Sequence, residues 1–210
     1  MTPILLVALL SGLLPAQAPA AAQTAPPMPP PATVPAATVS VTLTTAEGPI
    51  VLALEKDRAP VTTANFLRYV DGKKLDGVAF YRAMKLGDGP GGASGLIQFG
   101  TSNDSRRTLP PIAHEPTSKT GLTHTDGAIS MAMIAPGTAA GDIFIIVGDL
   151  HTLDATATDP GFAVFGHVAE GMDVVRRILA APTSPTEGEG VMKGQMLSPA
   201  IKVISARRTD

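Results

Sequence analysis

Cysteine and tryptophan are both absent from this chain of 210 residues, and only 16% of its residues are charged. Without cysteine the chain has no disulfides, no thiolate metal ligands and no cysteine nucleophile. The net charge of −2 contains no basic excess, so we expect no nucleic-acid partner. Hydrophobic residues nevertheless make up 44% of the chain, which is enough for the packed core of one domain.

Residues 1–22 have the pattern of a signal peptide. The apolar run from Ile4 to Leu14 is shorter than the roughly 20 residues that cross a bilayer. Small residues follow, and Ala20-Ala21-Ala22 before Gln23 predicts cleavage after residue 22, although no lysine or arginine precedes the apolar run. We therefore expect a periplasmic or secreted protein that has no membrane span after processing.

Proline and alanine dominate residues 23–37, which predicts a semi-rigid, solvated linker. The folded domain is expected at residues 38–208. Its first residues, 39–44 and 50–54, alternate between apolar and polar side chains, and this alternation predicts an antiparallel hairpin.

Two helices and several short strands are expected after this hairpin. Pro60 suits the first turn of a helix that ends at Asp71-Gly72. A second helix is predicted over Asp173 to Ala180, with Asp173 as its N-cap. Short apolar runs predict strands at 78–82, 96–99, 128–133, 143–147, 163–168 and 201–206. This content favours a mainly β fold, a barrel capped by two α-helices.

The sequence contains few residues in patterns that indicate acid–base or metal chemistry. The four histidines have no metal-ligand spacing, and we expect them on loops or strand surfaces. The carboxylates are scattered rather than paired. The glycine-rich residues 87–92 lack the Lys-Ser/Thr of a phosphate-binding loop, which favours a flexible loop. We therefore predict no metal and no cofactor.

Arg82 and Gln98 are the remaining candidates for chemistry. Arg82 ends one predicted strand and Gln98 lies within the next. Together they offer fixed hydrogen-bond donors without acid–base exchange. A purely structural role for the arginine fits these residues as well.

The order of the motifs resembles the cyclophilin-type peptidyl-prolyl cis-trans isomerases, as a divergent, exported bacterial member. Phe80-Tyr81-Arg82 is similar to the Phe-His-Arg of that family. The similarity extends from Val39 to Ala206. It includes Val41-Thr42-Leu43, Gly48-Pro49-Ile50-Val51-Leu52, Ala59-Pro60-Val61-Thr62-Thr63-Ala64-Asn65-Phe66, Gly127-Ala128-Ile129-Ser130-Met131-Ala132, Phe144-Ile145, Leu153-Asp154 and Val164-Phe165-Gly166-His167-Val168.

The resemblance implies a closed eight-stranded antiparallel barrel capped by two helices, which isomerises X-Pro bonds of flexible or unfolded polypeptides without covalent chemistry. It assigns Arg82 as the catalytic arginine and Gln98 as its partner. The implied substrate-binding residues are Leu96, Met131, Ala132, Phe144, Leu153 and Phe162. We also expect a monomer.

Several positions depart from the family pattern. Gly95 replaces an aromatic residue, Thr152 stands where tryptophan is common, and Phe162 occupies the position of a histidine. Residues 85–94 suggest an inserted loop at the edge of the groove. The alternative is therefore a weakly active or inactive module that binds proline-containing chains as a chaperone or adaptor. A small-ligand barrel would need an enclosed cavity, which this resemblance does not imply.

Overall fold

The structure is a computed structural model that describes residues 37–89 and 92–209, all within the compact unit Pro35–Asp210. The predicted signal peptide and nearly all of the predicted linker lie outside the described residues. None of the described helices is long and apolar enough to cross a membrane.

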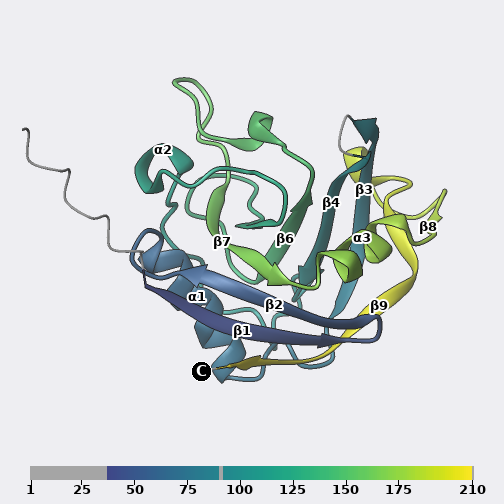
Figure 1. Cartoon of the computed structure of the whole chain (residues 1–210), viewed down its shortest axis with the longest axis horizontal. Coiled ribbons are helices and arrows are strands. Elements are labelled where there is room, and N and C mark those ends of the chain that lie inside the picture. The colour runs from purple at the N-terminus through teal and green to yellow at the C-terminus, as the bar shows by residue number, and fades with distance from the viewer. Residues whose placement is uncertain (1–36, 90–91, 210) are drawn as a thin grey trace, which may run out of the picture. The chain divides into compact units, whose positions relative to one another are not determined.

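Nine strands form one antiparallel sheet, in which eight strands close into a barrel (Figure 1). Their order is β1-β2-β7-β5-β6-β4-β3-β9, and pairing of β1 with β9 closes the ring. The strands are β1 (Thr38–Thr45), β2 (Gly48–Glu55), β3 (Ala79–Gly89), β4 (Gly92–Gly100), β5 (Ala128–Met131), β6 (Asp142–Val147), β7 (Ala163–Glu170), β8 (Thr183–Ser184) and β9 (Met196–Arg208). The short β8 pairs only with β9. The eight-stranded barrel predicted from the resemblance is therefore confirmed.

Alternating side chains fill the interior of the barrel. Val41 and Leu43 on β1, and Ile50, Leu52 and Leu54 on β2, are buried as their period of two predicts. Aromatic pairs complete the core: the ring centroids of Phe66 and Phe165 lie 5.4 Å apart, and those of Phe80 and Phe99 lie 4.7 Å apart. The interior is a packed core of side chains.

Helices α1 (Pro60–Asp71) and α3 (Met172–Ala180) cover the barrel, and a third, four-residue helix, α2 (Thr117–Thr120), was not predicted. Its sequence TSKT has no apolar period. Two 3₁₀ turns, η1 (His151–Leu153) and η2 (Gly190–Met192), lie in the connections. The predicted N-cap of α3 is wrong: Gly171 occupies that position in a left-handed conformation, and Asp173 instead pairs with Arg177 at 2.6 Å.

The loop predicted over residues 85–94 is also wrong for the described residues 85–89 and 92–94. Strands β3 and β4 continue as a hairpin that pairs Lys85 with Gly95 and Gly89 with Gly92. A bulge between Lys85 and Gly87 requires Gly95, where φ is +151° and a Cβ atom would lie 2.0 Å from the Met84 carbonyl oxygen. The glycines therefore accommodate a bulged hairpin.

The N-terminus of α1 is capped by a side chain from a distant loop. Ala59 at the N-cap offers no side-chain acceptor, but the buried carboxylate of Glu115 takes its place. Glu115 accepts hydrogen bonds from the backbone N–H of Val61 at 3.2 Å and of Thr62 at 2.7 Å, and from the Thr62 hydroxyl at 2.7 Å. A negative charge here also interacts favourably with the helix dipole.

We predict that Glu115→Ala lowers the free energy of unfolding by about 2 kcal/mol, because two N–H groups of the first helical turn lose their acceptor. Urea denaturation measures this change, with exposed Glu189→Ala as the matched control. Equal unfolding free energies for the two variants would contradict the capping role.

Candidate active site

Arg82 and Gln98 lie side by side on neighbouring strands, as the sequence suggested. A bulge between Phe80 and Arg82 sets the register, and Arg82 of β3 then pairs directly with Gln98 of β4. The Arg82 Nη1 group donates to Gln98 Oε1 at 3.0 Å. Directly opposed residues project to the same face of a sheet, so the barrel itself fixes this contact.

Gln195 binds the same guanidinium and was missed by sequence reasoning. The Arg82 Nε group donates to Gln195 Oε1 at 2.8 Å, across 113 positions of sequence. Gln195 immediately precedes β9, whose first residue, Met196, pairs with Arg82. No sequence motif marks Gln195, which stands alone in a polar connection. The contact with Arg82 becomes evident only in the folded barrel.

The guanidinium of Arg82 is half-buried and carries an uncompensated charge. Both of its short contacts are to neutral amides, and among the described residues no carboxylate lies within ion-pair distance of it. Burial lowers the pKa of Arg82, but an arginine remains protonated at neutral pH. Within the described part of the chain, the Nη2 group has only a 3.7 Å contact with Met84 Sδ, a weak acceptor. Its donors can therefore serve a substrate.

A second polar chain lies beside Gln98. The Tyr81 hydroxyl donates to Asp142 Oδ1 at 3.2 Å, and the same oxygen accepts from the Ser102 N–H at 2.9 Å. Burial raises the pKa of both Tyr81 and Asp142, and a hydrogen bond with Gln98 opposes the shift of Tyr81. The phenol therefore stays protonated and acts as the donor in this pair.

An aromatic and aliphatic cluster continues from the polar pair. Phe144 on β6 is paired with Gln98, so Arg82, Gln98 and Phe144 form one row across three strands. These strands, β3, β4 and β6, are neighbours in the sheet (Figure 1). The Phe144 and Phe162 rings meet edge to face, with centroids 5.4 Å apart. The Phe162 N–H donates to the Leu153 carbonyl at 3.0 Å, which places Phe162 beside η1.

The other expected substrate-binding residues differ in accessibility. Leu96 is buried on β4, two positions from Gln98. Ala132 is partly buried just beyond β5, and its N–H donates to the Asp142 carbonyl at 2.9 Å. Met131 is fully buried in the core, backbone included, so it supports the cluster from within.

His124 corrects the expectation that every histidine lies on a loop or strand surface. Its ring is fully buried and hydrogen bonds with Asp154 Oδ1 at 2.7 Å and with Ser130 Oγ at 3.0 Å. It also stacks on Phe144, with an interplanar angle of 8° and centroids 6.0 Å apart. The surrounding Thr and Asp residues suggested a solvated loop. In the structure, the Asp154 carboxylate and the Ser130 hydroxyl provide hydrogen-bond partners for both nitrogens of the buried ring.

The order Ser130, His124, Asp154 has the connectivity of a hydrolytic triad. Ser130 is fully buried, however, so its hydroxyl cannot meet a substrate carbonyl. Burial lowers the pKa of His124, and a neutral ring can donate one proton to Asp154 while accepting from Ser130. The three residues therefore have a structural role: Asp154 and Ser130 hold the His124 ring against Phe144.

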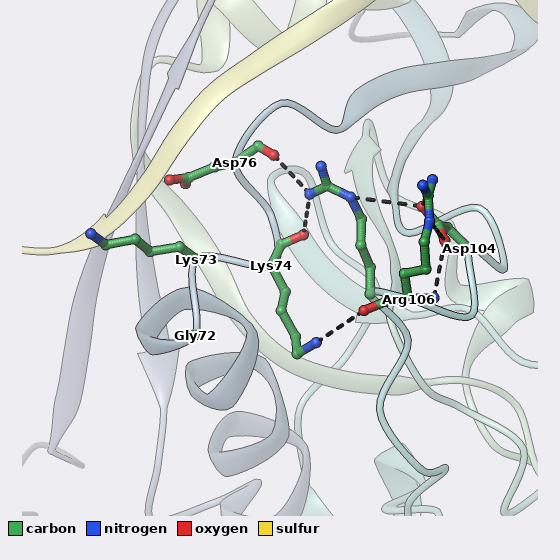
Figure 2. A pocket seen from close by; sticks show the side chains of 7 residues that line it. Gly72, Lys73, Lys74, Asp76, Asp104 and Arg106 are labelled. Carbon is green, nitrogen blue, oxygen red and sulfur yellow. Dashed lines mark hydrogen bonds and ion pairs between the residues drawn. The ribbon is translucent and has the colours of Figure 1, made fainter.

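A separate polar hollow of about 410 Å³ lies where the turn after α1 meets the loop after β4 (Figure 2). Three of its four cations, Lys74, Arg106 and Arg107, already have partners in the protein. Figure 2 shows the Lys74 ammonium directed at the Arg106 carbonyl, and the Arg106 guanidinium beside Asp104. Arg107 donates to the carbonyls of Lys74 and Asp76, both at 2.8 Å. We assign no ligand to this hollow.

One family of known proteins resembles this chain over most of its length. A family model described as cyclophilin type peptidyl-prolyl cis-trans isomerase/CLD matches residues 40–206. A peptidyl-prolyl cis-trans isomerase of Acinetobacter baylyi is 37% identical over 145 residues, covering 69% of this chain and 73% of the relative. The chain belongs to the cyclophilin-type peptidyl-prolyl cis-trans isomerase family.

A second relative and a solved structure are also similar to this chain. Peptidyl-prolyl cis-trans isomerase A of Dickeya dadantii is 36% identical over 144 residues, covering 68% of this chain and 72% of the relative. The crystal structure of a Cryptosporidium parvum cyclophilin type peptidyl-prolyl cis-trans isomerase superposes with a TM-score of 0.65 and covers 83% of this chain and 99% of that one. At a sequence identity of 17%, this superposition shows a shared fold alone.

Because His124 is buried, we predict that the free energy of unfolding decreases as the pH becomes acidic. The pKa of His124 is lowered by burial from its ordinary 6.5, so the unfolded chain binds this proton more readily than the folded one. The stability due to the neutral ring is therefore fully present above pH 6.5 and is lost as the pH falls towards the folded pKa. Burial would raise the pKa of Asp154, but its hydrogen bonds from His124 and His151 lower it below 3.8, so its own effect begins at more acidic pH.

We expect His124→Gln to show a smaller loss of unfolding free energy than wild type between about pH 7 and about pH 5. Urea titrations at the two pH values measure this difference, and exposed His167→Gln should behave like wild type. An identical pH dependence in His124→Gln and wild type would show that His124 is not responsible.

Proposed function

We propose that the chain catalyses cis-trans isomerisation of X-Pro bonds in flexible or unfolded exported polypeptides, acting as a monomer without metal or cofactor. The observation that supports this most directly is the Arg82 guanidinium, held by two neutral amides in the same row as Phe144. The family membership of the chain agrees with the same activity.

The chemistry follows from the electronic structure of the imide bond. Resonance keeps the X-Pro bond planar, and its uncatalysed rotation takes tens to hundreds of seconds. Twisting the bond breaks the resonance and localises a lone pair on the prolyl nitrogen. A guanidinium that donates to this nitrogen stabilises the twisted state more than the planar state, which is the requirement for catalysis.

Arg82 is suited to this role because its charge has no carboxylate partner among the described residues. Gln98 and Gln195 occupy Nη1 and Nε, which leaves Nη2 to donate to the twisted nitrogen. The planar fork of arginine keeps these donors at fixed angles to one another, whereas a lysine ammonium would rotate.

The neighbouring apolar cluster supplies a surface for the proline ring. We assign the ring contacts to Leu96, Phe144, Leu153 and Phe162, and a contact with the substrate backbone to Ala132, which follows the fully buried Met131. Phe162 offers a larger apolar area than a histidine would, and its edge-to-face contact fixes it against Phe144.

A second candidate function is binding of proline-containing chains without rate enhancement. Three positions favour it: Gly95 and Thr152 place no aromatic side chain beside the cluster, and Phe162 replaces a polar ring. The backbone at Gly95 also leaves no space for a larger residue. A module of this kind would act as a chaperone or adaptor that uses the same groove.

We predict that Arg82→Ala lowers kcat/KM for an X-Pro peptide by about 100- to 1000-fold, the scale of losing one preorganised donor. Arg82→Lys should restore only part of the rate, because the ammonium cannot keep the two amide contacts in the same plane. A protease-coupled isomerase assay measures the rates, with Arg106→Ala, exposed and remote from the cluster, as the control.

If wild type and Arg82→Ala both show only the uncatalysed rate of isomerisation, the proposed isomerase activity is ruled out. Saturable binding of the peptide by wild type, measured in the same samples by NMR titration, would then favour the binding module. Neither acceleration nor binding would exclude both functions.

Export is a further part of the proposal, and the sequence of residues 1–22 supports it. Expression of the full chain in a Gram-negative host should place the protein in the periplasmic extract with Gln23 as its first residue. N-terminal sequencing checks this, and recovery of an uncleaved chain in the cytosol alone would contradict it.

A further inference from the structure

Gln195 is a fully hydrogen-bonded polar residue next to the candidate catalytic group. Its backbone N–H donates to the Met192 carbonyl at 3.0 Å, and its carbonyl accepts from the Ala83 N–H at 2.9 Å. Its side-chain Nε2 donates to the Val191 carbonyl at 2.8 Å, and Oε1 accepts from Arg82 Nε at 2.8 Å. All four polar groups of Gln195 therefore have partners.

These contacts determine which end of the amide faces Arg82. Because Nε2 is committed to the Val191 carbonyl on η2, only Oε1 can point at the guanidinium. A carbonyl oxygen is an acceptor, and Arg82 Nε is a donor, so the orientation is complementary. Had the amide been reversed, two donors would face each other.

Two acceptors fix a guanidinium where one would not. A single hydrogen bond to Nη1 allows the planar group to pivot about that contact. Gln98 on β4 and Gln195 before β9 approach Arg82 from the two strands that flank β3, and together they fix its plane. Both acceptors are neutral, so this orientation is achieved without neutralising the positive charge.

We infer that Gln195 is a positioning residue for catalysis, which holds the Nε edge of Arg82 so that Nη2 faces the prolyl nitrogen; this inference rests on the proposed isomerase function. Gln195 acts through Arg82 and need not touch the substrate. The turn η2 takes part as well, because the Val191 carbonyl sets the orientation of the amide.

The test compares Gln195→Leu, which removes the acceptor at similar size, with Gln195→Glu, which retains an oxygen towards Arg82. Lys193→Ala, exposed on the same connection, is the control. Gln195→Leu should lower kcat about tenfold with little change in KM, the scale of one lost hydrogen bond to a charged group. Gln195→Glu keeps the oxygen but compensates the charge of Arg82, so kcat should fall although Arg82 stays oriented. All variants should melt within a few degrees of wild type.

The NMR resonance of the Arg82 Nε–H provides a readout that does not depend on catalysis. It should shift and exchange with water at least about tenfold faster in Gln195→Leu, while Gln195→Glu and Lys193→Ala keep it protected. An unchanged resonance and unchanged kcat in Gln195→Leu would overturn the inference, as would equal loss of protection of the resonance in Gln195→Leu and Gln195→Glu. If wild type shows no isomerase activity, the proposed function fails, and the resonance alone decides whether Gln195 orients Arg82.

Discussion

The contacts of one guanidinium with two amide oxygens are the interaction on which the candidate site depends. Arg82 donates from Nε to Gln195 and from Nη1 to Gln98, at 2.8 and 3.0 Å. These contacts keep a positive charge half-buried, oriented and free of a carboxylate among the described residues. A carboxylate in either place would bind more strongly but would also compensate the charge that a twisted imide needs.

The closed barrel makes this arrangement possible. Gln98 and Gln195 are brought to opposite sides of Arg82 because β4 and β9 both pair with β3. The bulge after Phe80 shifts the register so that Arg82, Gln98 and Phe144 lie in one row. Behind that row, the buried His124 stacks on Phe144 and is itself held by Asp154 and Ser130. Neighbouring strands thus hold the Arg82 donors, and the His124 cluster supports the apolar surface of Phe144.

Much of the fold could be predicted from local patterns. The alternation of Val41 and Leu43 with polar residues predicted a strand, and Pro60 marked the start of α1. The similarity of Phe80-Tyr81-Arg82 to a family motif led to the pairing of Arg82 with Gln98. These features depend on residues that are close in sequence or belong to contiguous motifs.

The features that the sequence did not predict depend on distant contacts. Gln195 meets Arg82 across 113 positions, and Glu115 caps α1 from a loop more than fifty residues away. His124 stands among polar residues, so its burial depends on partners that only the folded chain supplies. Gly95 directly follows the segment predicted as a loop, although a bulged hairpin needs its positive φ. The composition of a segment predicts its local structure, but the roles of these residues depend on contacts with distant parts of the folded chain.

A crystal structure of the folded domain with an Ala-Pro-containing peptide would test the central claim most directly. The account predicts that the proline ring lies against Phe144, with Arg82 Nη2 within hydrogen-bond distance, up to about 3.2 Å, of the prolyl nitrogen. Gln98 and Gln195 should still accept from Nη1 and Nε in that complex. A peptide bound elsewhere on the barrel, or an Arg82 side chain turned away from the nitrogen with its amide contacts broken, would contradict the account.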